Sequence, residues 1–231
     1  MFTEIAGRDM ASTRKAGPRP AAKTAAKAEP HDQSMLDRLK FFSDAVFAIV
    51  LTLLVLELKA PEAHSAEELW AGLARMSSHF IAFALTFAVI SIFWTAHMSN
   101  LRALKQFDWP AAVMNLVHLF SICLLPFVSS VLADARFGPA AWAVYSVVLI
   151  WASAANVALV LTIWRGGGRL VSGLPAGSGA YRVARAATPG IAFGLGLVGI
   201  ALGQITLARL CWLLIPALFL VFQLLLKPKP A

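Results

Sequence analysis

Six long apolar segments, separated by short polar connections, dominate the pattern of hydrophobic and polar positions along this chain. An α-helix rises about 1.5 Å per residue, so roughly 20 apolar residues cross the hydrocarbon core of a bilayer. We therefore predict an all-α membrane protein with six transmembrane helices. The turn between the last two segments is very short, which leaves a re-entrant hairpin as an alternative there. The expected spans are Phe41–Leu58, Phe80–Met98, Pro110–Leu132, Ala140–Trp164, Pro189–Ile205 and Leu207–Leu226.

Composition supports a membrane protein and disfavours a nucleic-acid-binding one. The chain is 59% hydrophobic and only 14% charged, which is too apolar for a soluble globule. Its formal net charge of +8 comes from basic residues that flank the apolar segments and do not form a patch interleaved with aromatic residues. We therefore expect membrane lipids, and no nucleic acid, as partners. The two cysteines lie inside apolar segments and offer no disulfide or zinc spacing.

The distribution of basic residues predicts two regions and an orientation. Residues 1–34 are rich in Ala, Pro, Lys and Arg without an apolar run, which is typical of a disordered basic tail. Residues 35–231 form the six-helix domain. The tail, the second–third loop, the fourth–fifth loop and the C-terminus together hold most of the Lys and Arg. The positive-inside rule then places both termini in the cytoplasm, in a multi-pass protein of the cytoplasmic membrane.

The first apolar segment carries a carboxylate, Asp44, one turn inside the predicted helix. Such a charge costs about 2.5–3.5 kcal/mol on insertion scales, so it needs a partner or water. At about 100° per residue, Asp44 lies more than a quarter-turn from a separate stripe along the helix. From the pattern alone, the apolar part of this stripe faces lipid or the protein core. The stripe comprises Arg38, Phe42, Ala45, Ile49, Thr52, Leu53 and Leu56.

Further polar side chains lie in or at the ends of the second and third segments. Because polar groups in hydrocarbon must be satisfied, we predict a buried polar cluster that joins them to the first helix. Two interpretations stay open: structural support of the first helix, or gating and proton sensing by histidine. The cluster would contain Ser43, Asp44, Trp94, His97, Asn115 and His118, with Arg38 pairing at its cytoplasmic end.

Motifs for catalysis or cofactor binding are absent or out of context. Gly194–Gly199 matches G-x-G-x-x-G, but it lies inside a predicted membrane helix, where small residues four apart favour close helix packing. The five histidines show no H-E-x-x-H spacing, and no carbonyl-filter sequence of the T-V-G-Y-G type is present. We predict a protein that is not an enzyme and has neither a metal site nor a cofactor.

Three stretches in order resemble a known family. Arg38 followed by Phe42-Ser43-Asp44 spells R-x-x-x-F-S-D, and F-W-x-x-H follows at Phe93–His97. The third stretch is NLVHLFSICLLPF, which starts at Asn115. Together they resemble the first three helices of the transmembrane protein 175 family of potassium channels, in its single-repeat bacterial form. The resemblance covers roughly Arg38 to Pro126.

The resemblance implies a homotetramer whose first helices surround a pore permeable to potassium ions. Ile49, Leu53 and Leu56 would form an apolar constriction, which gates by dewetting and favours the weakly hydrated potassium ion. Thr52 would replace some of the lost water oxygens and so contribute to selectivity. The conserved polar patch of the family, here with Arg38 and Phe42 as members, would hold the first helix against its neighbours.

Two rival functions remain open. A proton-conducting protein or proton-coupled secondary transporter would use Asp44, His97 and His118 as a relay. Such transporters usually show repeats and broken helices, whereas the first span of this chain contains neither Gly nor Pro and the sequence shows no repeat. A membrane scaffold without transport is the third possibility. Flux from liposomes distinguishes the three.

Overall fold

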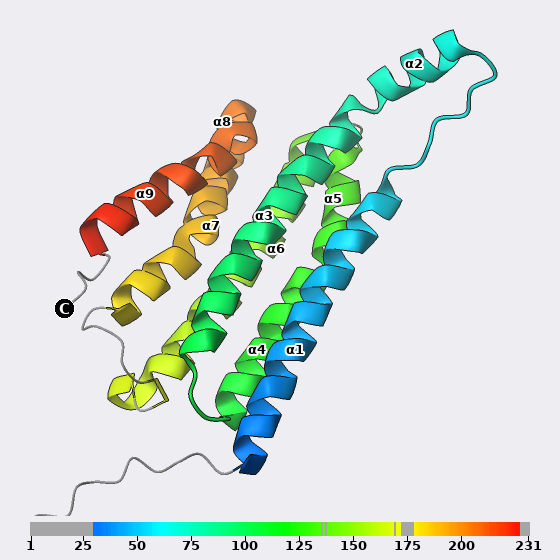
Figure 1. Cartoon of the computed structure of the whole chain (residues 1–231). Coiled ribbons are helices and arrows are strands. Elements are labelled where there is room, and N and C mark those ends of the chain that lie inside the picture. Colours follow the sequence, from blue (N-terminus) through cyan, green and yellow to red (C-terminus); the bar gives the residue numbers. More distant parts are fainter. Residues whose placement is uncertain (1–29, 135, 137, 169, 172–177, 227–231) are drawn as a thin grey trace, which may run out of the picture.

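The computed structural model describes residues 30–134, 136, 138–168, 170–171 and 178–226. In this part of the chain, long helices run alongside one another in a bundle (Figure 1). The predicted tail lies outside the described residues except for 30–34, which are helical and extend the first helix toward the N-terminus. The elements are α1 Pro30–Leu53, η1 Leu54–Glu57, α2 Ala66–Arg75, α3 Ser77–Ala103, α4 Trp109–Cys123, α5 Leu125–Ala133, α6 Gly138–Gly168, α7 Ser178–Ala201, α8 Ile205–Leu210, η3 Cys211–Leu213 and α9 Leu214–Leu226.

Six helical stretches are long and apolar enough to cross a membrane, which confirms the predicted number of spans. The last two stretches contain 24 and 22 residues, so each is long enough to span and the hairpin alternative is unnecessary. The chain therefore folds as a six-span, multi-pass membrane protein.

Two spans differ from the bounds predicted from the sequence. The third span breaks at Leu124, between α4 and α5. Pro126 lacks an N–H and its ring crowds the carbonyl of Ile122, which ends the regular ladder of α4. The fifth span, expected to begin at Pro189, already begins at Ser178, and Pro189 lies inside α7. Hydropathy missed its first three turns because they carry two arginines.

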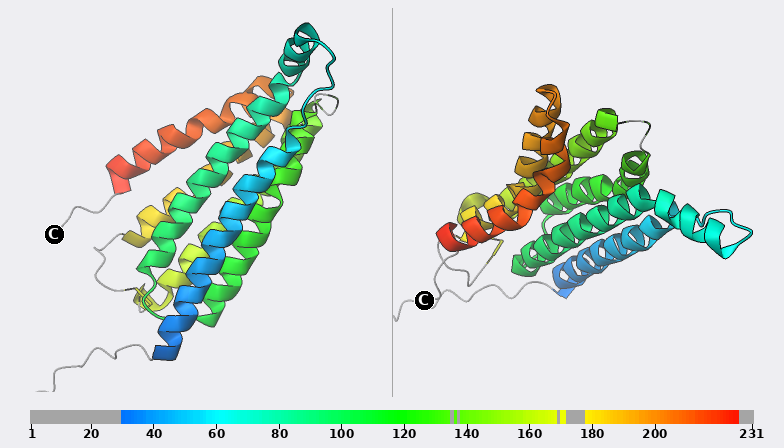
Figure 2. Two further views of the ribbon diagram at one scale, coloured as in Figure 1. Left: turned by 45° about the vertical axis from the view of Figure 1, so that its right-hand side comes forward. Right: turned by 90° about the horizontal axis from the view of Figure 1, so that it is seen from above.

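The helices pack around α6, which contacts α4 on one side and α7 on the other. α3 packs on α5, and α1 packs on α3 and α4. α9 contacts α7, so α1 and the α8–α9 segment lie on opposite margins of the bundle (Figure 2). α2 projects beyond the end of the bundle at the start of α3 (Figure 1).

Glycine allows α7 to approach its neighbours closely. A Cβ at Gly190 would come within 2.8 Å of Ser153 Oγ on α6, and one at Gly196 within 2.8 Å of Cys211 Sγ. Gly194, by contrast, has open space on that side, so only some of the glycines serve packing. The G-x-G-x-x-G match lies wholly within α7, as predicted, and the described residues contain no strand ahead of it.

Candidate functional site

One face of α1 is anchored in the bundle. Phe47 and Leu54 are buried to 1% and 0% exposure, and Ser43 lies on the same face at 0%. These positions recur at helical spacing, so this face of α1 packs against α3 and α4. The other members of this face are Leu36 and Val50.

The opposite face of α1 stays open in the single chain. Ile49 is 56% exposed, Leu53 45% and Leu56 67%, although all three are branched apolar residues. Leu53 ends α1, and Leu56 lies in the tighter 3₁₀ turn that follows. The stripe predicted from the sequence is therefore left uncovered by the chain's own helices.

Thr52 lies on this open face with its hydroxyl turned to its own helix. Thr52 Oγ1 donates a hydrogen bond to the carbonyl oxygen of Ile49 at 2.8 Å. Because the hydroxyl proton is engaged by the backbone, the oxygen lone pairs remain available to accept or to coordinate a cation.

A direct hydrogen bond joins α1 to α4. Asn115 Nδ2 donates to Ser43 Oγ at 3.0 Å, and Ser43 Oγ in turn donates to the carbonyl oxygen of Leu39 at 2.8 Å. Both side chains are fully buried. The structure thus brings together two of the residues that the sequence assigned to one polar cluster.

Asp44 does not lie in that cluster, and in this respect the prediction of a single buried network was wrong. Its side chain is exposed in the single chain and accepts a hydrogen bond from Trp94 Nε1 at 3.1 Å. Successive residues on a helix point about 100° apart, so Ser43 faces Asn115 on α4 while Asp44 faces Trp94 on α3. Asp44 instead joins α1 to α3 at the margin of the bundle.

The two histidines form a third, separate group. The rings of His97 and His118 lie 5.4 Å apart, and Phe47 lies against both, at 5.4 Å and 6.2 Å between ring centroids. His118 Nδ1 is within hydrogen-bond distance, 3.1 Å, of the carbonyl oxygen of Ala152 on α6. Among the described residues, neither ring nitrogen of His97 has a hydrogen-bond partner. The histidines therefore sit in an aromatic enclosure without a hydrogen-bonded link to Asp44.

Arg38 and Phe42 also lie apart from the buried groups. Both are exposed on α1, and Phe42 is 51% exposed. Within the described part of the chain, no hydrogen bond or ion pair joins Arg38 to the polar residues of α3 or α4. These two residues flank the open face and do not contribute to the inner contacts.

Sequence reasoning missed a polar row on α6. Ser146, Ser153 and Asn156 are buried, and Ser153 Oγ donates to the carbonyl oxygen of Ala186 on α7 at 2.6 Å. Their spacing of seven and three residues places them on one helix face, which was the signal that could have revealed them. Asn156 has no side-chain hydrogen-bond partner among the described residues.

Two basic residues tie the helix ends together and were also missed. Arg165 on α6 pairs with Asp108 at 2.6 Å, while Asp108 caps α4 through the N–H of Ala111. Arg182 on α7 donates to the carbonyl oxygen of Ser99 at 2.7 Å, near the end of α3. A cation there is favourable because the helix dipole is negative at its C-terminus.

No group of three or more His, Cys, Asp or Glu side chains within the described ranges is arranged to hold a metal ion. The candidate site is therefore defined by the open apolar face of α1 and by the contacts that fix its other side.

Together these features define a class: a six-span α-helical membrane protein whose first helix is anchored on one face and open on the other. Residues 38–126 match the family model of the endosomal/lysosomal potassium channel TMEM175. Over this region the chain is similar to the TMEM175 family, which confirms the resemblance found in the sequence.

Solved structures of TMEM175 channels share the fold. A lysosomal potassium-selective channel TMEM175 homologue from Chamaesiphon minutus is 26% identical, with a TM-score of 0.64 over 82% of this chain and 99% of that one. A variant of the potassium channel MtTMEM175, solved with a nanobody fusion protein, is 19% identical, with a TM-score of 0.60 over 93% of this chain and 100% of the other. The fold therefore extends beyond the matched segment to the later helices.

The curated relatives match over part of their length. A potassium channel of Chryseobacterium sp. is 33% identical over 128 residues, which is 55% of this chain and 65% of that protein. The endosomal/lysosomal proton channel TMEM175 of Bos taurus is 32% identical over 104 residues, 42% of this chain and 22% of that protein. The chain thus spans less than two thirds of each of these relatives.

Proposed function

We propose that four copies of this chain form a passive, potassium-permeable channel in the cytoplasmic membrane, with both termini in the cytoplasm. The observation that carries this proposal is the open face of α1. Ile49, Leu53 and Leu56 are exposed, whereas Phe47, Val50 and Leu54 on the other face of the helix are buried in the bundle. In the tetramer, the four open faces meet at a common axis and line the pore.

The need for several copies follows from the number of such faces. One chain supplies one helix of this kind, and a single helix cannot enclose a pore. Closed rotational symmetry lets identical faces converge on one axis. Bacterial relatives described as potassium channels support this assignment.

The constriction works through the cost of removing water from an ion. A ring of branched apolar side chains a few ångströms wide expels water, and it gates by dewetting. An ion that gives up part of its hydration shell at low cost passes more readily, which favours potassium over sodium. The Thr52 oxygens, one turn beyond Ile49, replace part of that shell. This arrangement yields modest selectivity, because no ring of backbone carbonyls surrounds the ion.

A proton relay is less well supported. Asp44 is bonded to Trp94, and His97 and His118 lie in a separate aromatic enclosure. The relatives named as proton channels align over only about a fifth of their own length. The flux experiment below therefore includes a proton readout.

The test is ion flux through the full chain reconstituted in liposomes, with Ile49→Asn as the diagnostic variant. We expect potassium efflux down its gradient without strict coupling to protons. Ile49→Asn should raise the conductance and lower the potassium-to-sodium permeability ratio, because an amide ring holds water where the apolar ring expels it. The measurement is single-channel recording in bilayers under bi-ionic conditions.

Leu161→Asn provides the matched control, since Leu161 on α6 is 55% exposed and lies on no predicted pore face. It should leave conductance and permeability ratio unchanged. Unchanged permeation in Ile49→Asn would place the constriction elsewhere. Strict proton coupling would favour the transporter, and the absence of any flux would favour a scaffold.

A further inference from the structure

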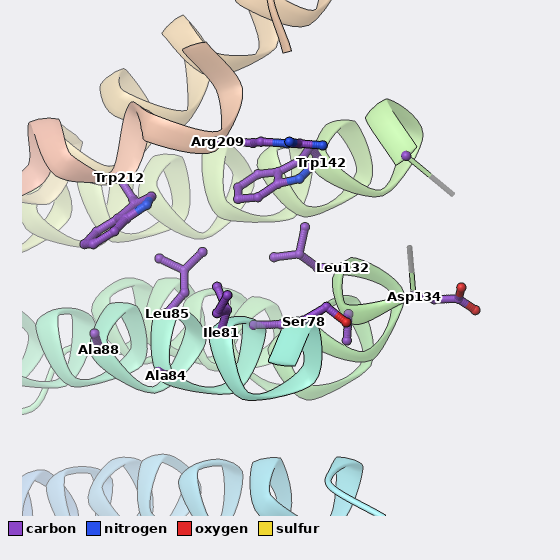
Figure 3. A pocket seen from close by; sticks show the side chains of 13 residues that line it. Ser78, Ile81, Ala84, Leu85, Ala88, Leu132, Asp134, Trp142, Arg209 and Trp212 are labelled. Atoms are coloured by element: carbon purple, nitrogen blue, oxygen red, sulfur yellow. The ribbon is translucent and has the colours of Figure 1, made fainter. Parts of the chain in front are cut away.

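A cavity of about 670 Å³ lies on the side of the bundle away from α1. Its walls come from α3, the end of α5, the start of α6 and the α8–η3 segment (Figure 3). This volume is in the range of sites that bind small molecules. The pore proposal makes no use of it.

The cavity has one polar end and a long apolar interior. Ser78, in the first turn of α3, and Asp134, which follows α5, lie at the polar end, while Ala88 lies ten residues further along α3. At 1.5 Å per residue the cavity extends about 15 Å along the helix, which is about half of a bilayer's hydrocarbon core. The length of the cavity therefore matches the thickness of one leaflet, from the interface to the middle of the membrane.

The apolar interior is open because the last span departs from α3. α9 packs on α7 and has no comparable contact with α3. Ala84 and Ala88 contribute small side chains to the α3 wall beside Ile81 and Leu85. Trp142 and Trp212 stand opposite this wall (Figure 3). Tryptophan is enriched where membrane helices meet the interface, next to lipid headgroups.

Among the described residues that line the cavity, Arg209 is the cation that can serve a ligand at the polar end. Asp134 is engaged by Arg136 at 2.6 Å, and this guanidinium holds the pKa of Asp134 at about 2. Arg209, on α8, lines the same cavity and has no hydrogen-bond or ion-pair partner among the described residues. An arginine inside a membrane span requires an anion or water, and its fork geometry suits a phosphate group.

We propose that this cavity binds one phospholipid of the surrounding bilayer, with an acyl chain between α3 and the α8–η3 segment and its phosphate hydrogen-bonded to Arg209. The apolar interior accepts the chain, and Trp142, beside Arg209, borders the glycerol region. A lipid held in this way fills the gap that the last span leaves beside α3.

The test is native mass spectrometry of the full chain, delipidated in detergent and titrated with phosphatidylglycerol. Two variants address the two halves of the site. Arg209→Gln should weaken the tightest lipid association about tenfold, because a charge-assisted hydrogen bond to phosphate is lost. Ala88→Phe should weaken it similarly by filling the apolar interior, while Arg209→Lys should retain part of the affinity.

Two control substitutions lie on α3 and α6, outside the cavity. Arg102→Gln removes a cation from the far end of α3, and Ala154→Phe enlarges an exposed alanine of α6 outside the cavity. Both should bind lipid as the parent does. Equal affinity in Arg209→Gln, Ala88→Phe and the parent would overturn the proposal. A change in oligomeric state in Ala88→Phe with unchanged lipid affinity would overturn it too, because a second copy of the chain would then occupy the cavity. Lipid binding is measured without ion flux, so its failure is distinct from that of the channel proposal.

Discussion

At the scale of single residues, the link between α1 and α4 rests on one buried pair of polar side chains. Ser43 Oγ accepts a hydrogen bond from Asn115 and donates one to a backbone carbonyl, so its donor and one acceptor position are both occupied. Asn115 Oδ1 has no partner among the described residues. In lipid, such interhelical bonds contribute about 0.6 kcal/mol on average and about 1.7 kcal/mol at most.

A double-mutant cycle of Ser43→Ala and Asn115→Ala should therefore give a coupling free energy of about 0.6–1.7 kcal/mol. Each single variant should lower the midpoint of thermal unfolding in detergent, and the double variant should lose less than the sum. The measurement is unfolding followed by loss of the folded peak on size exclusion. Strictly additive losses would mean that the observed hydrogen bond does not hold the two helices.

The polar side chains also show what could not be predicted from the sequence. Intramembrane Ser43, Asp44, His97 and Asn115 could be recognised as polar groups that need partners, but their partners could not be assigned. The assignment depends on the direction of each side chain, which differs by about 100° between Ser43 and Asp44. One expected network is in fact three local groups.

At the scale of elements, α1 combines two functions on opposite faces. Leu54 is 0% exposed and packs in the core with Phe47, whereas Leu53, its neighbour in sequence, is 45% exposed. Two adjacent leucines of the same size thus occupy opposite environments, which allows packing and permeation to be separated by experiment.

Leu54→Ala should destabilise the fold by about 2–5 kcal/mol, the usual cost of a cavity at a buried leucine. Leu53→Ala should leave the unfolding midpoint of the chain close to that of the parent and widen the proposed constriction, which raises conductance. Thermal unfolding and single-channel recording of both variants provide the check. A large loss of stability in Leu53→Ala with normal permeation in both would show that the open face serves packing.

The helices could be predicted from the sequence where hydrophobicity alone determines their position. The six spans and the two faces of α1 follow from length and period. The early start of α7 was not predictable, because Arg182 and Arg185 interrupt the apolar pattern. Arg182 is accommodated by the end of α3, through Ser99 and Asn100, and this tertiary contact leaves no trace in local sequence.

At the scale of the whole molecule, the single chain leaves α1 among its least covered helices. Only 22% of the most apolar part of this span is buried, against 50% for the third and fourth spans. A comparably uncovered last span, at 17%, lies on the opposite margin of the bundle. Either margin offers an apolar surface to neighbouring copies, and the polar Thr52 beside the exposed branched residues favours α1 as the axial one.

Disulfide cross-linking tests this placement directly. In a background with Cys123 and Cys211 replaced by serine, Ile49→Cys should form dimers on oxidation, because residues at a narrow symmetry axis approach one another. Leu224→Cys, 75% exposed on α9, is the control and should stay monomeric on a denaturing gel. Particles of four 24.8 kDa chains, about 99 kDa of protein, should be measured by light scattering in the same samples. Cross-linking through Leu224 but not through Ile49 would move the axis to the last span, and the pore would then have to be sought among the residues of α9.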